Sequence, residues 1–196
     1  MSLLEIEGLT HSFGENLLYK NAGFTLNKGE HIGIVGQNGT GKSTLIKICT
    51  EQIIPDSGRI VWQPNTTIGY LDQYAEIDHT LTMKEFLKSA FTKLFEMEAQ
   101  ALQLYEKAAD GDMKSLELAA RYQEQLEAHD FYSIDTAIDR VANGLGLLAI
   151  GLDRPIAEMS GGQRAKVILA KLLLEKPDVL LLDEPTNFLD KDHVSS

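Results

Sequence analysis

The chain of 196 residues is long enough for one good-sized domain, or for one domain with an insertion. Its 43% hydrophobic and 24% charged residues are ordinary for a soluble globular protein, and no apolar stretch is long enough to span a membrane. The formal net charge of −11 argues against a broad, non-specific nucleic-acid surface, but it leaves a local contact with RNA or protein open.

The N-terminus and the cysteine content indicate the compartment. The first residues, MSLLEIEG, lack the basic and then apolar layout of a secretory signal. Cys49 is the single cysteine, so it cannot form an internal disulfide, and we expect a buried thiol. A cytoplasmic location is therefore expected.

Short β-like runs occupy the first part of the chain. They cover residues 3–6, 23–26, 59–62 and 68–71, and turn sequences precede the third run and follow the second, at 56–58 and 27–29. Together they predict a β-rich flap beside a parallel core, which we expect to begin at residues 31–35.

A glycine-rich run at residues 36–44 reads GQNGTGKST and fits the phosphate-binding P-loop pattern. The apolar run 32–35 predicts a strand before it, and residues 45–49 predict a helix after it. This strand–loop–helix setting favours a real site over the plain alternative, a glycine-rich turn with a chance lysine. The run therefore predicts a nucleoside-triphosphate site.

Each residue type in this loop has a physical role. Glycines let successive backbone N–H groups point at phosphate oxygens, and the N-terminus of the next helix favours negative charge. Lys42 is placed to reach the β- and γ-phosphates, and Ser43 to bind Mg²⁺. The loop residues expected to contact the nucleotide are Gly36, Asn38, Gly39, Thr40, Gly41, Lys42, Ser43 and Thr44.

Helical periodicity begins near Thr82. Apolar residues recur three or four apart on both sides of the turn at 110–112, which predicts two antiparallel helices packed as a hairpin. Thr82 and Glu85 have the capping-box spacing, and a first helix of about 25 residues would be roughly 37 Å long. Residues 84–130 hold six Lys/Arg and ten Asp/Glu, so the hairpin offers a solvated face rather than a basic patch.

The last part of the chain adds two motifs. Residues 135–141 predict a helix that ends near Asn143-Gly144, and Ser160 is a candidate N-cap for a helix over 163–174. An apolar run at 179–182 predicts a strand buried on both faces. Taken singly, the glycines after Ser160 could be a simple helix cap.

Two adjacent acids follow that strand, where an α/β sheet presents its carboxyl ends. Asp183 would support Mg²⁺ together with Ser43, and Glu184 would polarise an attacking water. On its own, such a pair would better fit a solvated loop, so the order of all the motifs decides the interpretation.

That order resembles the nucleotide-binding domain of the ATP-binding cassette (ABC) superfamily. Residues 159–163, MSGGQ, are similar to the family's LSGGQ sequence, with Met replacing Leu. The resemblance implies an α/β fold: a P-loop NTPase core with an antiparallel β subdomain and an inserted helical hairpin. It also implies ATP and Mg²⁺ as ligands.

The same resemblance assigns further residues. Phe13, some 23 residues before the P-loop, matches the aromatic that stacks on adenine, and Gln73 matches the glutamine that touches Mg²⁺ and the attacking water. Gln73 and Glu184 would be catalytic, and the metal would be held by Ser43, Gln73 and Asp183. Contacts to the nucleotide of a partner domain would come from Ser160, Gly161, Gly162 and Gln163.

A narrower resemblance concerns the ABC-F subfamily, whose members act on the ribosome and lack membrane domains. Residues 183–190, DEPTNFLD, are similar to that subfamily's DEPTNHLD, with Phe188 where His is usual, and include the D-loop match at 187–190. Eighty-seven positions separate Gln73 from Ser160, more than in typical transporter domains, and the excess falls on the hairpin. ABC-F proteins carry a helical arm at this place.

We therefore divide the chain into four parts. Residues 1–81 form the β subdomain and P-loop core, 82–130 the hairpin arm, and 131–175 the helical subdomain with SGGQ. Residues 176–196 hold the strand with Asp183 and the D-loop, with the core incomplete at the C-terminus. The family's switch histidine lies roughly 30 residues beyond Glu184, whereas 12 residues follow Glu184 here, so we expect the first domain of a longer ABC-F chain, cut before that histidine.

In the family, ATP lies between the P-loop of one domain and the SGGQ helix of another. The implied partners are a second ABC domain, in the same chain or in a homodimer, and the ribosome. The chain alone is expected to bind ATP with little turnover. Two alternatives remain: the ATP-binding subunit of a membrane transporter with a membrane partner, and a non-catalytic interaction module.

Overall fold

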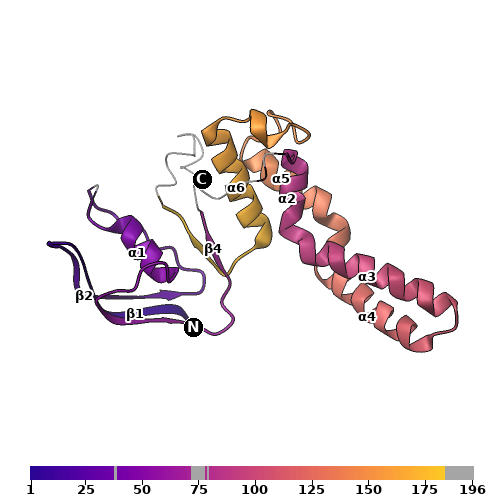
Figure 1. The fold of residues 1–196 in the computed structure, drawn as a ribbon, viewed down its shortest axis with the longest axis horizontal. Helices are drawn as coiled ribbons and strands as arrows, with labels where there is room; N and C mark the ends of the chain where they lie inside the picture. Colours follow the sequence, from indigo (N-terminus) through magenta and orange to yellow (C-terminus); the bar gives the residue numbers. More distant parts are fainter. Residues whose placement is uncertain (38, 72–77, 79, 184–196) are drawn as a thin grey trace. The chain divides into compact units, whose positions relative to one another are not determined.

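The computed structural model describes residues 1–37, 39–71, 78 and 80–183 (Figure 1). Over these residues the chain forms two compact units. The first unit comprises residues 1–71 and 177–183, and the second comprises 78 and 80–176. In the part of the chain that the structure describes, no helix combines the length and the apolar character that a membrane crossing requires.

An antiparallel sheet forms most of the first unit. Its strands β1 (Ser2–Phe13), β2 (Asn16–Asn27) and β3 (Ser57–Trp62) lie in the order β2-β1-β3. The helix α1 (Lys42–Cys49) packs on this sheet through an apolar cluster. Its buried members are Leu4, Ile6, Leu9, Leu45, Ile48 and Cys49. The indole N–H of Trp62 donates to the Cys49 carbonyl at 3.0 Å, which ties the end of α1 to β3.

The strands predicted at 3–6, 23–26 and 59–62 and the helix predicted at 45–49 are confirmed, but β1 and β2 are much longer than the predicted runs. Each has 12 residues, because pairing continues along the hairpin as far as the partners Phe13 and Asn16. Cys49 is buried, as expected for an inert thiol.

A second, two-stranded sheet pairs β4 (Ile68–Tyr70) in parallel with β5 (Val179–Leu181). Just before the strands, the Asp178 carboxylate accepts hydrogen bonds from the Thr67 backbone N–H at 2.9 Å and hydroxyl at 2.8 Å. The Asp178 N–H in turn donates to the Thr67 hydroxyl oxygen at 2.9 Å. The predicted strand at 179–182 is confirmed over three residues, but only Val179 is buried, so the expectation of burial on both faces is wrong.

The strand predicted at 32–35 is wrong in this structure. Residues 31–37 lie outside the strands, and the side chains of Ile32, Ile34 and Val35 are 45%, 45% and 93% exposed. An apolar run becomes a strand only where a neighbouring strand satisfies its backbone N–H and C=O groups. No described strand pairs with this run, so its sequence pattern alone does not fix its conformation.

The second unit is helical. Its helices are α2 (Met83–Lys88), α3 (Thr92–Ala109), α4 (Met113–Ala128), α5 (Ile134–Gly144) and α6 (Gly161–Glu175), with short 3₁₀ turns η1 (Ser89–Phe91), η2 (Phe131–Ser133) and η3 (Ile156–Glu158). The predicted helices near 135–141 and 163–174 are thereby confirmed. The core of this unit joins residues of α2, α4, α5 and α6, including Leu87, Leu126, Ile138 and Val167.

The helical hairpin consists of α3 and α4, which run side by side in opposite directions (Figure 1). The predicted capping box at Thr82 and Glu85 is present at the start of α2. A single first helix of about 25 residues is wrong, because η1 separates α2 from the 18 residues of α3, about 27 Å long. At this break the Ser89 hydroxyl donates to the Phe86 carbonyl at 2.6 Å, a local bond that competes with regular helix.

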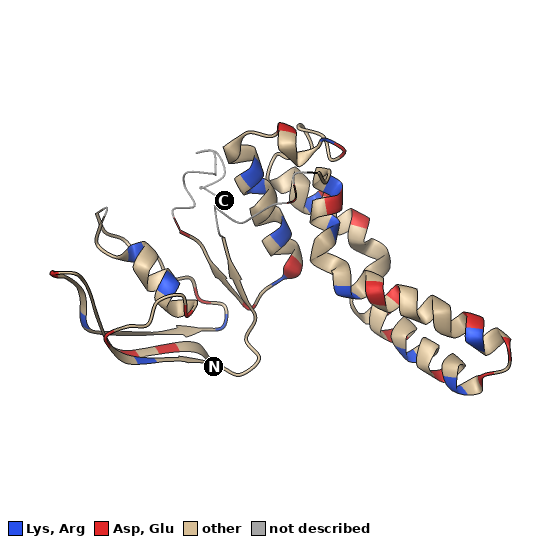
Figure 2. Ribbon diagram, in the orientation of Figure 1, with Lys and Arg blue, Asp and Glu red and all other residues tan. Residues whose placement is uncertain are grey.

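The outer part of the hairpin is thinly packed. Ala101, Ser115 and Ala119 are buried between the two helices, whereas Leu102 and Leu116 are 58% and 40% exposed. The predicted hairpin is present, but part of the apolar stripe that predicted it is exposed at these outer leucines. Acidic and basic residues are mixed along both helices (Figure 2). Arg121 and Glu117 of α4 form an ion pair at 2.9 Å.

Candidate nucleotide site

The P-loop joins α1 through two glycines with left-handed backbone. Gly39 has φ 85° and Gly41, the N-cap of α1, has φ 97°, conformations that favour glycine. A Cβ on Gly41 would lie 2.6 Å from the hydroxyl oxygen of Tyr19, and that hydroxyl donates a hydrogen bond to the Gly41 carbonyl. Both positions would strain a residue with a side chain, and Gly41 would also obstruct one, which suits the approach of a ligand to the backbone.

Lys42 reaches back across the loop. Its Nζ donates to the Gly36 carbonyl at 2.8 Å and to the Gln37 carbonyl at 2.9 Å. The Thr40 hydroxyl donates to the same Gln37 carbonyl at 2.8 Å. A lysine ammonium has three donors, so one remains for a phosphate oxygen while two hold the loop.

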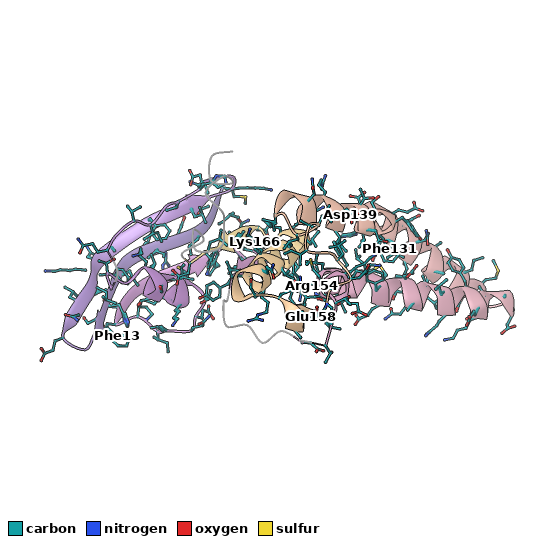
Figure 3. The ribbon with its side chains drawn as sticks, turned by 90° about the horizontal axis from the view of Figure 1, so that it is seen from above. Phe13, Phe131, Asp139, Arg154, Glu158 and Lys166 are labelled. Atoms are coloured by element: carbon teal, nitrogen blue, oxygen red, sulfur yellow. The ribbon has the colours of Figure 1, made fainter. Side chains whose placement is uncertain are left out.

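A pocket of about 360 Å³ lies over this loop, within the first unit. Its volume falls in the range of small-molecule sites. The pocket is lined by Phe13, Asn16, Leu18, Gly39, Gly41, Lys42, Ser43 and Thr44. Phe13, at the end of β1, is 71% exposed (Figure 3), so its ring is available to a flat ligand. The pocket therefore combines cationic and N–H groups with an aromatic face.

The structure brings together six of the residues predicted from the sequence to form the nucleotide site: Phe13, Gly39, Gly41, Lys42, Ser43 and Thr44. Gly36 and Thr40 belong to the same loop but not to the pocket wall. The predicted residues Asn38, Gln73 and Glu184, and the D-loop match at 187–190, lie outside the described residues.

A nucleotide with Mg²⁺ fits the groups that are present. The ammonium of Lys42, the glycine backbone and the exposed Ser43 hydroxyl are donors and ligands suited to phosphate and to a hard cation. Asp183 follows β5 in the same unit. Among the described residues, no cluster of three or more His, Cys, Asp or Glu side chains offers a metal site of its own. A cation here would therefore depend on phosphate oxygens as well as on Ser43 and Asp183.

Burial changes the chemistry of two groups behind the loop. It raises the pKa of the Tyr19 phenol, which keeps this hydroxyl a hydrogen-bond donor. It also raises the pKa of the Cys49 thiol to about 11. Neither group is prepared to act as a nucleophile, so we assign both a structural role behind the loop.

The SGGQ segment opens α6 in the second unit, and its predicted N-cap is confirmed. The Ser160 hydroxyl oxygen accepts from the Gln163 N–H at 3.2 Å, and the Ser160 N–H donates to the Gln163 side-chain oxygen at 3.0 Å. Because Ser160 accepts in this box, its own hydroxyl proton stays free for an anion. Cβ atoms on Gly161 and Gly162 would meet nothing within 4 Å, so the first turn is open.

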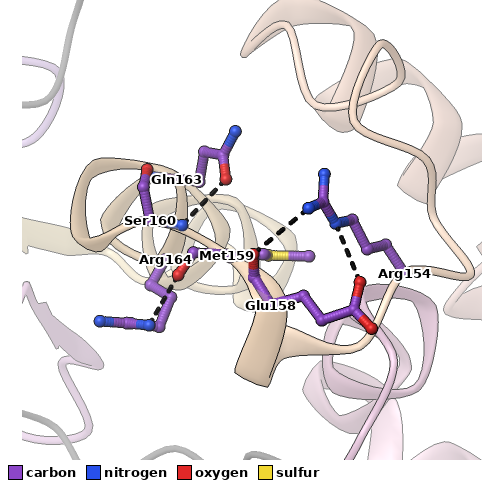
Figure 4. A network of polar contacts seen from close by, with 6 residues as sticks. All are labelled: Arg154, Glu158, Met159, Ser160, Gln163 and Arg164. Atoms are coloured by element: carbon purple, nitrogen blue, oxygen red, sulfur yellow. Dashed lines mark hydrogen bonds and ion pairs between the residues drawn. The ribbon is translucent and has the colours of Figure 1, made fainter.

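Two arginines fix the backbone before this helix (Figure 4). Arg164 donates to the Met159 carbonyl at 2.7 Å. Arg154 donates to the Glu158 carbonyl at 3.4 Å and forms an ion pair with the Glu158 carboxylate at 3.4 Å. Sequence reasoning missed both arginines, as it missed Asn16 and Tyr19. The position of Arg164, four residues after the cap, was the one local signal for its contact.

Comparisons with known proteins identify the family of the chain. The sequence model described as ABC transporter matches residues 19–187. YfmM of Bacillus subtilis (strain 168), named an uncharacterized ABC transporter ATP-binding protein, is 46% identical over 99% of this chain and 38% of its own length. ABC transporter F family member 5 of Arabidopsis thaliana is 34% identical over 97% of this chain and 29% of its own length. The chain thus spans less than two fifths of these relatives.

A translational relative and a solved structure complete the comparison. The energy-dependent translational throttle protein EttA of Escherichia coli (strain K12) is 38% identical over 91% of this chain and 32% of its own length. A structure titled as the ATP binding subunit of an ABC transporter aligns with a TM-score of 0.66 at 22% identity, over 98% of this chain and 70% of the other. This structural likeness confirms the α/β P-loop fold expected from the sequence.

Proposed function

The chain belongs to the ABC transporter family, with relatives in its F family, and from this premise we propose that the P-loop pocket binds ATP with Mg²⁺. The single observation that carries the proposal is the pocket that joins Lys42 and Ser43 to the exposed ring of Phe13. The ring stacks on adenine, while Lys42 and the loop N–H groups hold the phosphates.

The proposed reaction is hydrolysis of ATP to ADP and phosphate. When bound, Mg²⁺ would neutralise phosphate charge, and Ser43 and Asp183 would hold it, with Gln73 as a further proposed ligand. Glu184 is the proposed general base, and Gln73 orients the water. These roles rest on sequence position, because Gln73 and Glu184 lie outside the described residues.

The SGGQ helix serves a different nucleotide from the one at Lys42. We assign its open first turn and the free hydroxyl proton of Ser160 to the ATP held by a second ABC domain, in the same polypeptide or in a second copy. The chain has one P-loop and one SGGQ sequence, so it supplies one half of each of two composite sites. Alone it would bind ATP with little turnover.

In this proposal ATP binding closes two ABC domains on each other, and this closure acts on the ribosome. Support comes from the hairpin, from the sequence TNFLD, and from a relative whose name states a translational role. In this proposal residues 1–81 and 176–196 build the nucleotide core, 82–130 the arm and 131–175 the helical subdomain with SGGQ. A cytoplasmic location belongs to the same proposal.

The second candidate is the ATP-binding subunit of a membrane transporter. The match to the family model described as ABC transporter supports this candidate, whereas the solved subunit at 22% identity speaks for the fold alone. In that case the partner would be a membrane protein, and the hairpin would need a different role.

Sedimentation with ribosomes separates the two candidates. The complete gene product that contains this chain would carry Glu184→Gln, with the corresponding glutamate of any second ABC domain changed too. Losing the general base should trap the ATP-bound, closed state, so the ribosomal proposal predicts pelleting with ribosomes in ATP but not in ADP. The same protein with Lys42→Ala added should stay in the supernatant. Failure to pellet while ATP binding is intact would favour the transporter subunit.

A further inference from the structure

We infer that Asn16 reads the edge of the bound base and gives the site a preference for adenine over guanine nucleotides. The inference rests on the proposed ATP site. Its starting point is the tip of the β1–β2 hairpin, where Phe13 and Asn16 are directly paired across the turn. Residues directly opposite in an antiparallel pair project from the same face, with Cβ atoms about 5 Å apart.

Both residues line the same pocket as Lys42 and Ser43. With the phosphates held at Lys42, the 71% exposed ring of Phe13 is the aromatic face in the pocket wall on which the base can stack. A base stacked on that ring has its edge, rather than its face, directed toward a side chain standing beside the ring. Asn16 is the residue in that position among the described lining residues.

The Asn16 amide is uncommitted. Its side chain makes no hydrogen bond to any residue in the described part of the chain, and Asn16 is exposed. Asn27, at the other end of β2, shows the contrast, because its amide donates to the Glu30 carboxylate at 3.1 Å. An amide has one acceptor and two donors, so the Asn16 group can satisfy a donor–acceptor pair on a ligand.

Adenine presents such a pair at its N6 and N7 edge, the pairing that asparagine makes with adenine bidentately. Guanine presents two acceptors there, O6 and N7, and the amide oxygen cannot pair with either. An amide can tell adenine from guanine only at this edge. At the Watson–Crick edge each purine presents a donor beside an acceptor, so a flipped amide could pair with either. The inference therefore commits Asn16 to the N6/N7 edge.

The test compares ATP and GTP binding by titration calorimetry in wild type, Asn16→Ala and Glu15→Ala. Glu15 is the exposed neighbour in the same turn and does not line the pocket, so it is the matched control. We expect wild type and Glu15→Ala to prefer ATP over GTP about tenfold, and Asn16→Ala to bring the affinity ratio close to one. A loss of stability would weaken both nucleotides alike and leave the ratio unchanged.

A second probe isolates the predicted contact. The 7-deaza analogue of ATP lacks the N7 acceptor, so it should bind wild type more weakly than ATP but bind Asn16→Ala as ATP does. An ATP-to-GTP ratio that Asn16→Ala leaves at the wild-type value would overturn the inference while the nucleotide site stands. Absence of ATP binding by wild type would overturn the site and the inference together.

Discussion

The hydroxyl of Tyr19 donates a hydrogen bond to the carbonyl oxygen of Gly41, the residue that caps α1. The same carbonyl accepts the first helical hydrogen bond, from the Leu45 N–H at 2.9 Å. Strand β2 therefore holds the junction between the P-loop and its helix. This contact organises the loop before any ligand arrives, and preorganisation lowers the cost of binding.

Replacing Tyr19 by Phe should weaken ATP binding about three- to tenfold. One hydrogen bond contributes about 1 kcal/mol, and its loss frees the Gly41 carbonyl end of the loop. Titration calorimetry measures the affinity. Tyr132→Phe is the control, because its hydroxyl accepts an exposed hydrogen bond from Gln123 in the other unit. Equal affinities for Tyr19→Phe and wild type would show that the loop does not depend on this contact.

Replacing Thr82 by Ala should lower the stability of the helical unit by about 1 kcal/mol, the usual cost of losing an N-cap. Thr82 accepts from the Glu85 N–H at 3.3 Å, and the Glu85 carboxylate accepts from the Thr82 N–H at 2.8 Å. Urea unfolding followed by circular dichroism measures the change. Thr92→Ala removes an exposed threonine whose hydroxyl donates to the Ser89 carbonyl at 2.8 Å, and the start of α3 has no side-chain cap, so this change should cost less; an equal loss would contradict a capping role for Thr82.

The Asp178 carboxylate should make stability depend on acidity. The Thr67 N–H and then the Thr67 hydroxyl lower the pKa of Asp178 below its ordinary value of 3.8. Its folded-state pKa is therefore below the unfolded one, so its contribution is present above pH 3.8 and is lost as pH falls through the lower native value. Asp178→Asn should flatten the acid limb of a urea-midpoint profile. An unchanged limb in Asp178→Asn would contradict the assignment.

Cys49 should resist thiol reagents in the native protein. It is buried, and burial raises its pKa to about 11, so little thiolate forms at pH 8. Because it is the single cysteine, a colorimetric reagent reports on it alone. We expect slow labelling in buffer and rapid labelling in urea. Rapid labelling in both would mean that α1 does not stay packed on the sheet.

Local signals in the sequence predicted local structure well. Thr82 with Glu85, and Ser160 with Gln163, form capping boxes at helix starts. Both partners of each box lie within four residues, so their spacing in the sequence indicates the cap. The strand at 32–35 could not be predicted in this way, because a strand depends on partners far along the chain. The break between α2 and α3 at Ser89 coincides with a single hydrogen bond, from the Ser89 hydroxyl to the Phe86 carbonyl, which spacing does not reveal.

In the candidate site, too, residues within one local motif were predictable, whereas residues brought in by distant contacts were not. The P-loop is contiguous, so its pattern predicted Lys42 and Ser43 directly, and both line the pocket. Asn16, Tyr19 and Arg154 act through hairpin register or contacts that residue spacing does not reveal. The proposed catalytic residues Gln73 and Glu184 lie outside the described residues, so they remain predictions.

The most direct test of the nucleotide site is titration calorimetry of the chain with ATP and Mg²⁺, in wild type, Lys42→Ala and Lys47→Ala. Lys47 lies on the same helix, is exposed and does not line the pocket, so its loss removes the same charge without touching the site. The account predicts that wild type and Lys47→Ala bind ATP and that Lys42→Ala does not. Unchanged binding by Lys42→Ala would contradict it.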